Sequence, residues 1–150
     1  MYEKILVPLD GSKRAEKILP HVEELASCLG SMLLYLDVVS PVYLLMDPMV
    51  SYVDINASET EALIEEAKDY LGTLVRQADS KGINAGSRVE QGPVVETIID
   101  VARKENADLI AMASHGRSGF GRVFYGSIAA GVLQRVDRPL LLIRSRDDED

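Results

Sequence analysis

The stretch MLLYLDVV, residues 32–39, is apolar apart from Asp37. A strand that faces water on one side alternates apolar and polar residues, whereas a strand covered on both faces is apolar throughout. This stretch therefore predicts a strand that is buried on both faces, as in a parallel sheet.

Strand-like and helical patterns alternate along the rest of the chain. The other runs that are typical of strands are Lys4–Leu9, Ser87–Glu90, Asp108–Ala113 and Pro139–Ile143. Helical patterns lie between the strands, over residues 12–30, 58–81, from Pro93 onward, and 127–136. Strict alternation of strands with helical crossovers predicts one α/β domain, with a parallel sheet between two helical layers.

Several residues predict where the helices begin and end. Ser12 can cap the first helix, Gly30 can end it, and Pro20 is expected to bend it or strain a turn. Ser58 and Glu61 have the spacing of a capping box at the start of the second helix.

Composition limits the function classes. The 150 residues carry a net charge of −8, the acidic residues 147–150 form a tail, and no basic stripe is visible, so nucleic acid is not an expected partner. We expect one domain over residues 1–144 and a disordered acidic tail over residues 145–150. Cys28 is the only cysteine, and no apolar run approaches the ~20 residues of a membrane span, so we expect a cytoplasmic protein without membrane contact.

The turn after the first strand carries the first candidate site residue. Asp10 follows Pro8 and Leu9 and precedes Gly11-Ser12. Ligands of open parallel sheets bind at the carboxyl ends of the strands, where this carboxylate could accept hydrogen bonds from hydroxyls or an exocyclic amine. Alternatively, Asp10 only begins a turn that Ser12 caps, and turn chemistry alone favours that interpretation.

The stretch SHGRSGFGRVFYGS, residues 114–127, is the second candidate. It contains four glycines and joins a strand to a helix that begins near Gly126-Ser127. Free amides at a helix N-terminus favour an anion, and Arg117 and Arg122 add positive charge. The alternative is a mobile glycine loop with a serine cap and two solvated arginines. The strand–loop–helix context favours phosphate binding.

Other nucleotide and catalytic motifs do not fit. The chain has no G-x-x-x-x-G-K-[ST], its glycines do not spell G-x-G-x-x-G after the first strand, and Ser118 does not lie in G-x-S-x-G. Two histidines are too few for a metal cluster, and His115 is better placed as a hydrogen-bonding group than as a base.

The connection from Ser40 to Ala57 is long and rich in apolar residues. Connections of this length are uncommon without a role or disorder. It is either a loop packed over its own domain edge, or a lid or subunit contact, and the sequence does not separate these alternatives.

The chain resembles the universal stress protein family over nearly its whole length. The resemblance lies in the segments Lys4–Ser12, Leu33–Val39, Gly92-Pro93, Asp108–Gly116 and Arg138–Arg144. ATP-binding members carry G-x-x-G, nine residues, then G-[ST]. Here Ala113-Ser-His-Gly116 is followed by nine residues and Gly126-Ser127, so the spacing matches and Ala113 replaces the first glycine.

The resemblance implies a Rossmann-like five-stranded parallel sheet in the order 3-2-1-4-5. It also implies a stress-response module that binds an adenine nucleotide, ATP or AMP, with or without Mg²⁺, and a homodimer joined along Pro139–Ile143. Physical reasoning agrees with that dimer, because an apolar edge strand would otherwise expose unpaired backbone. The nucleotide-binding residues so implied are Pro8, Leu9, Asp10, Val38, Ala113, His115, Gly116, Arg117, Gly119, Gly126, Ser127 and Ile128.

Three functions are compatible with these observations. We rank a nucleotide-binding regulatory module first, a nucleotide-free interaction protein second and a slow ATPase third. Catalysis is last because the sequence shows no general base and no paired carboxylates for Mg²⁺. Asp10 is the only carboxylate that the sequence places at the site, and we therefore expect no enzyme.

Overall fold

The computed structural model describes residues 1–40, 57–114 and 126–145. Within them, a parallel sheet has the strand order β3-β2-β1-β4-β5. Its members are β1 (Lys4–Pro8), β2 (Met32–Val39), β3 (Ala85–Gln91), β4 (Leu109–Ala113) and β5 (Leu140–Ile143). The expected α/β class and strand order are confirmed.

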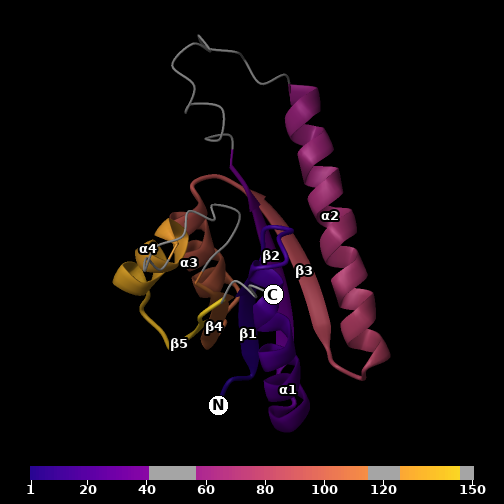
Figure 1. Cartoon of the computed structure of the whole chain (residues 1–150), viewed down its shortest axis with the longest axis vertical. Helices are drawn as coiled ribbons and strands as arrows, with labels where there is room; N and C mark the ends of the chain where they lie inside the picture. Colours follow the sequence, from indigo (N-terminus) through magenta and orange to yellow (C-terminus); the bar gives the residue numbers. More distant parts are fainter. Residues whose placement is uncertain (41–56, 115–125, 146–150) are drawn as a thin grey trace, which may run out of the picture.

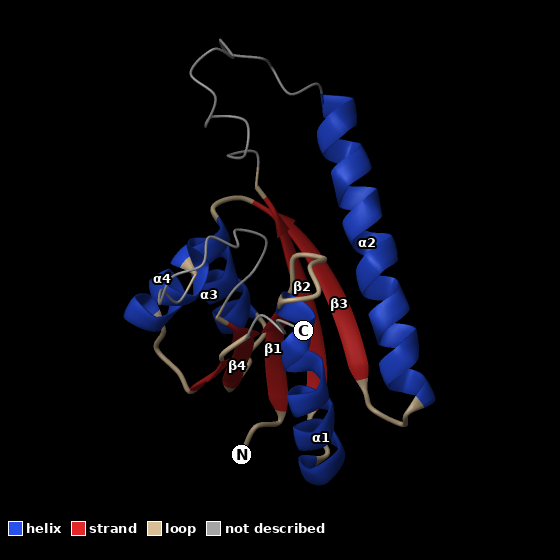
Figure 2. Cartoon of the chain, in the orientation of Figure 1, coloured by secondary structure: helices blue, strands red, loops and turns tan. Residues whose placement is uncertain are grey.

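Helices cover both faces of the sheet (Figures 1 and 2). The helix α1 (Leu19–Leu29) and the long α2 (Ala57–Ser80) lie on one face, while α3 (Val94–Lys104) and α4 (Ser127–Arg135) lie on the other. Alternate residues of each strand enter different cores. Ile5 and Val7 pack with α1 and α2, whereas Leu6 packs with α3 and α4. The MLLYLDVV stretch is indeed a strand buried on both faces over residues 33–36.

Asp108 fixes the position of β1 beside β4. Its carboxylate accepts hydrogen bonds from the backbone N–H of Glu3 (2.9 Å) and of Lys4 (3.1 Å). The Asp108 N–H donates in turn to the Lys4 carbonyl at 3.0 Å. Only Ile5 and Leu6 of β1 are paired in register with β4, so these three bonds extend a short ladder at its beginning.

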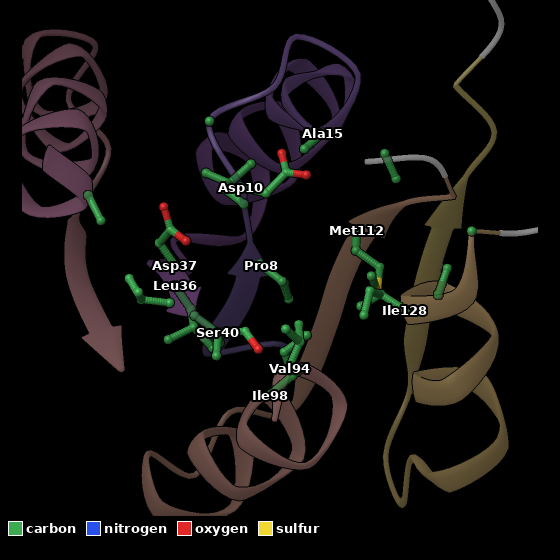
Figure 3. Close-up of a pocket in the computed structure, with 18 of the residues that line it drawn as sticks. Pro8, Asp10, Ala15, Leu36, Asp37, Ser40, Val94, Ile98, Met112 and Ile128 are labelled. Atoms are coloured by element: carbon green, nitrogen blue, oxygen red, sulfur yellow. The ribbon is translucent and has the colours of Figure 1, made fainter. Parts of the chain in front are cut away.

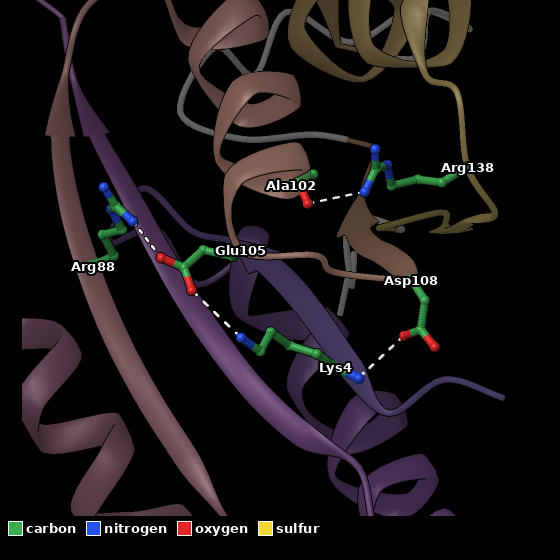
Figure 4. Close-up of polar contacts among 6 residues, drawn as sticks. All are labelled: Lys4, Arg88, Ala102, Glu105, Asp108 and Arg138. Carbon is green, nitrogen blue, oxygen red and sulfur yellow. Dashed lines mark hydrogen bonds and ion pairs between the residues drawn. The ribbon is translucent and has the colours of Figure 1, made fainter.

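Charged side chains tie the C-terminal end of α3 to its neighbours (Figure 4). Glu105 pairs with Lys4 at 3.4 Å and with Arg88 of β3. The Arg138 guanidinium donates to the carbonyls of Ala102 (2.9 Å) and Ala107 (2.6 Å). The Ala102 carbonyl also accepts from the Ala107 N–H at 2.9 Å, so Arg138 adds side-chain bonds to a turn that the backbone already closes after α3.

The helix starts differ in detail from the sequence predictions. A 3₁₀ turn over Ala15–Ile18 precedes α1, and the Ser12 hydroxyl accepts from the Ala15 N–H at 3.1 Å. Pro20 therefore lies in the first turn of α1, where its missing N–H costs no hydrogen bond, and the predicted bend in mid-helix was wrong. Gly30 ends α1 at φ 71°, as expected.

Two other helices begin earlier than their predicted caps imply, α2 by two residues and α4 by one. The helix α2 already begins at Ala57, so Ser58 lies inside it. Gly126 occupies the N-cap of α4, and Ser127 is the first helical residue. The tail beyond residue 145 and the connection 41–56 lie outside the described residues. No helix in the described part is long and apolar enough to cross a membrane.

The close approach of α3 and α4 depends on Gly131. An added Cβ at Gly131 would lie 2.8 Å from Cγ2 of Val95, whereas at Gly72 of α2 the nearest atom, Nη1 of Arg76, is 3.5 Å away. We predict that Gly131→Ala lowers the free energy of unfolding by about 1–3 kcal/mol through overpacking. Gly72→Ala should raise it by about 0.5–1 kcal/mol, because alanine is the better helix former.

Urea unfolding of both variants measures the difference. Adding Val95→Ala should reduce the cost of Gly131→Ala in a double-mutant cycle. Equal stabilisation by the two alanines would contradict the contact.

The second prediction concerns acid. Burial opposes ionisation of Asp108, but the N–H groups of Glu3 and Lys4 outweigh it and lower the pKa of this carboxyl. Because its pKa is lower in the folded state, ionised Asp108 stabilises the protein at pH values above the unfolded-state pKa of about 3.9. This stabilisation is lost as the pH falls through the folded-state pKa. Asp108→Asn should cost on the order of 1 kcal/mol at pH 7, because an amide cannot accept both bonds.

The stability difference between wild type and Asp108→Asn should shrink below about pH 4, where Asp108 becomes protonated. Urea titrations at pH 7, 5, 4 and 3 follow it, with Asp100→Asn on the exposed side of α3 as the control. A difference that stays constant from pH 7 to pH 3 would show that the charge of Asp108 does not matter.

Candidate functional site

A cavity of about 320 Å³ opens at the carboxyl ends of β1, β2 and β4. The strand order reverses direction between β1 and β4, since the chain proceeds outward from β1 to β3 and then returns to the other side of β1. In open α/β sheets this topological switch point is where ligands bind. The N-terminal turns of α3 and α4 and one face of α2 complete the walls.

Apolar side chains form much of the lining (Figure 3). The labelled apolar residues come from three strands, two helices and the 3₁₀ turn: Pro8, Ala15, Leu36, Val94, Ile98, Met112 and Ile128. A mostly apolar cavity with a few polar groups at defined places is the usual form of a small-molecule site.

The N-terminus of α4 lies at one end of the cavity. Its N-cap residue, Gly126, has no side chain that could cap the helix, and Ser127, Ile128 and Ala129 of the first turn line the cavity. The first N–H groups of a helix have no intrahelical acceptor, and the helix dipole adds positive potential there. The Gly126 N–H donates to the Ser114 carbonyl, while the Ser114 N–H donates to the Ile143 carbonyl at 2.8 Å. These bonds hold the helix start against the ends of β4 and β5.

The opposite side of the cavity carries oxygen atoms. We call Asp10, Asp37, Glu66 and Tyr70 the acidic wall; they come from the turn after β1, from β2 and from α2. Figure 3 shows Asp10 and Asp37 together on one side, away from Met112 and Ile128. No lysine or arginine is among the described residues that line the cavity.

Asp10 both shapes its turn and lines the cavity. Its Oδ1 accepts from the Ser12 N–H at 2.9 Å, and Gly11 adopts φ 81° in the turn. A side-chain bond to the backbone two residues on is an Asx turn. The two interpretations that the sequence left open are therefore compatible, because the turn directs this carboxylate to the cavity.

Tyr70 links α2 to the rest of the acidic wall. Its hydroxyl donates to Oε1 of Glu16 at 2.8 Å. Burial raises the pKa of Tyr70 far above its usual value, and the hydrogen bond to Glu16 and the charges of Glu16, Asp10 and Asp37 raise it further. The phenol therefore stays protonated, and the carboxylates of Asp10 and Asp37 lie near enough to act on it.

The structure brings together every predicted site residue that it describes. Eight line the cavity: Pro8, Leu9, Asp10, Val38, Ala113, Gly126, Ser127 and Ile128. The other four, His115, Gly116, Arg117 and Gly119, lie outside the described residues.

Sequence reasoning missed three residues of the acidic wall: Asp37, Glu66 and Tyr70. The sequence placed only one carboxylate at the site, Asp10, whereas Asp37 and Glu66 also line the cavity. A signal for Asp37 was present, since it is the single charge in a buried strand and lies toward its carboxyl end. The signal in α2 was the spacing of Leu63, Glu66, Ala67 and Tyr70, which places them on one helix face.

Comparison with known proteins identifies related sequences and structures. The family model described as "Universal stress protein family" matches residues 1–144. The universal stress protein MJ0577 of Methanocaldococcus jannaschii is 25% identical over 158 residues, covering 98% of each chain. Its structure superimposes with a TM-score of 0.84 at 26% identity, covering 99% of both chains.

Two more distant structures share the fold. A universal stress protein of Archaeoglobus fulgidus in complex with dAMP has a TM-score of 0.66 at 21% identity, covering 95% of this chain and 98% of its own. Another universal stress protein, in complex with cAMP, has a TM-score of 0.64 at 20% identity, with 97% and 98% covered.

Proposed function

The chain belongs to the universal stress protein family, and we propose that it acts as a regulatory module that binds an adenine nucleotide, ATP or AMP, in the cavity at the switch point. In this proposal Mg²⁺ binds only together with the nucleotide. Its setting would be a reducing cytoplasm, which suits the free, exposed Cys28.

The observation that carries this proposal is the polarity of the cavity. The N–H groups at the start of α4 favour phosphate at one end, and the acidic wall offers acceptors for hydroxyl or amine groups at the other. A nucleotide has an anion at one end and hydrogen-bond donors at the other. It matches the cavity in one orientation, with phosphate toward Gly126-Ser127 and the nucleoside toward Asp10.

The relatives support the same ligand class. Structures of the same fold have been solved with dAMP and with cAMP, both of which are adenine nucleotides. The identities of 21% and 20% carry the fold alone, so the ligand class of this chain depends on its own cavity.

The proposal assigns no catalytic residue. Among the described residues, no three His, Cys, Asp or Glu side chains are grouped so that they could hold a metal ion. Phosphoryl transfer depends on metal ions and a positioned nucleophile. We propose binding without turnover, in line with the ranking from sequence.

Calorimetry with ATP and AMP tests binding. We predict that Ala113→Gly changes the affinity by less than about tenfold, because Ala113 already fits the end of β4 and the amides of α4 are unchanged. Gly126→Val should weaken binding much more, since it adds bulk beside those amides. ATP recovered from the wild-type titration should be intact, with turnover well below ~1 per second.

Absence of binding by the parent, with binding restored in Ala113→Gly, would assign this chain to the nucleotide-free interaction proteins. Turnover at ordinary enzyme rates that Gly126→Val abolishes would favour the ATPase instead.

We also propose a homodimer through β5. The N–H groups of Ile110 and Ser114 donate to the carbonyls of Pro139 and Ile143, so alternate residues of β5 bond to β4. The backbone groups of the residues between them, Leu140 and Leu142, point away from β4. Among the described residues no further strand pairs with the outer edge of β5, and the side chains of β5 are all half-buried. A second copy of β5 would pair these groups.

We predict that Leu141→Lys produces monomers, because it places a charge at that contact. Leu133→Lys, the same change at a 51% exposed residue of α4, is the control. Light scattering gives the mass, and circular dichroism confirms folding. A dimer that survives Leu141→Lys and dissociates with Leu133→Lys would place the interface on α4, and survival of both would make the connection 40–57 the next candidate.

A further inference from the structure

The family motif accounts for the strand ends and the start of α4, but it does not include the part of the acidic wall that β2 and α2 supply. Asp37 lies on β2, and Glu66 and Tyr70 lie on α2. They meet Asp10 across the cavity from the α4 amides. Their role in recognition rests on the proposed function, since it concerns the same cavity.

These side chains offer acceptors and hardly any donors. Ionised carboxylates only accept hydrogen bonds, and a phenol has one proton. Tyr70 donates that proton to Glu16 at 2.8 Å, so its oxygen presents only lone pairs to other groups. Two neighbouring carboxylates, Asp10 and Asp37, act on the same phenol. A ligand group that lies here must therefore bring its own protons.

The contrast with the other end of the cavity makes this requirement selective. At α4 the polar groups are backbone N–H donors, which suit phosphate oxygens. A phosphate at the acidic wall would be repelled, and so would a carbonyl oxygen. A ribose with free 2′ and 3′ hydroxyls, or a base with an exocyclic amine, supplies donors.

We propose that Asp37, Glu66 and Tyr70 determine specificity by selecting nucleotides through the hydrogen-bond donors of the nucleoside. The relevant donors are the ribose hydroxyls or the 6-amino group of adenine. An analogue that lacks the donor loses a hydrogen bond to a charged acceptor, and such bonds are stronger than those between neutral groups. Affinity should therefore fall when one proton-bearing group is removed, although the phosphate is unchanged.

Calorimetry with AMP, 2′-deoxy-AMP, 3′-deoxy-AMP and inosine monophosphate tests this. At least one analogue should bind wild-type protein about tenfold more weakly than AMP or worse. The analogue whose affinity falls shows whether the acidic wall recognises the ribose hydroxyls or the 6-amino group. All three analogues binding within about twofold of AMP would overturn the inference and leave the proposed function intact.

Variants then identify which side chain of the acidic wall recognises the donor. Asp37→Asn, Glu66→Gln and Tyr70→Phe are near-isosteric, and at least one of them should bring the AMP-to-analogue ratio toward one. Asp69→Asn, an exposed carboxylate next to Tyr70 on α2, should keep the wild-type ratio. Circular dichroism shows whether each variant is folded.

An AMP-to-analogue affinity ratio that is unchanged in all three wall variants would mean that other groups bind the donor. It would overturn the assignment to Asp37, Glu66 and Tyr70. Failure of the wild-type protein to bind AMP or ATP at all would instead overturn the proposed function. The two failures are therefore distinguishable.

Discussion

Burial of the central strands on both faces is the constraint on which the rest of the structure depends. Residues 5–7 of β1 and 33–36 of β2 are sealed by helices on either side. An unpaired polar side chain in such a strand would carry a large desolvation cost. Charged side chains are therefore confined to the ends of these strands, where Asp10 follows β1 and Asp37 lies close to the end of β2.

The same constraint explains what the sequence could predict. A strand covered on both faces has to be apolar, so the hydrophobic pattern predicts β1, β2, β4 and β5, whereas β3, with the sequence AGSRVEQ, carries only a weak signal. The order of the strands came from the family resemblance, because periodicity does not say which strands are neighbours. The resemblance likewise identified site residues that are far apart in the sequence, and the eight that the structure describes line one cavity.

What the sequence did not predict depends on contacts between distant elements. Pattern alone places Tyr70 on a helix face, but only the packing of α2 against β2 and β3 brings it to Glu16 and the cavity. Pro20 was misjudged for a related reason, since its effect depends on where the helix begins, and the 3₁₀ turn before it decides that. Boundaries and cross-element contacts are tertiary properties, whereas hydrophobic periodicity is a local one.

The hydrogen bond from the Gly126 N–H to the Ser114 carbonyl has a consequence for how such a site can evolve. It joins the two residues that flank residues 115–125. The entropic cost of closing a flexible loop grows only slowly with its length. Segments of other lengths and compositions could therefore be exchanged between these anchors at little cost to the sheet, so that ligand preference can diversify while the scaffold is inherited unchanged.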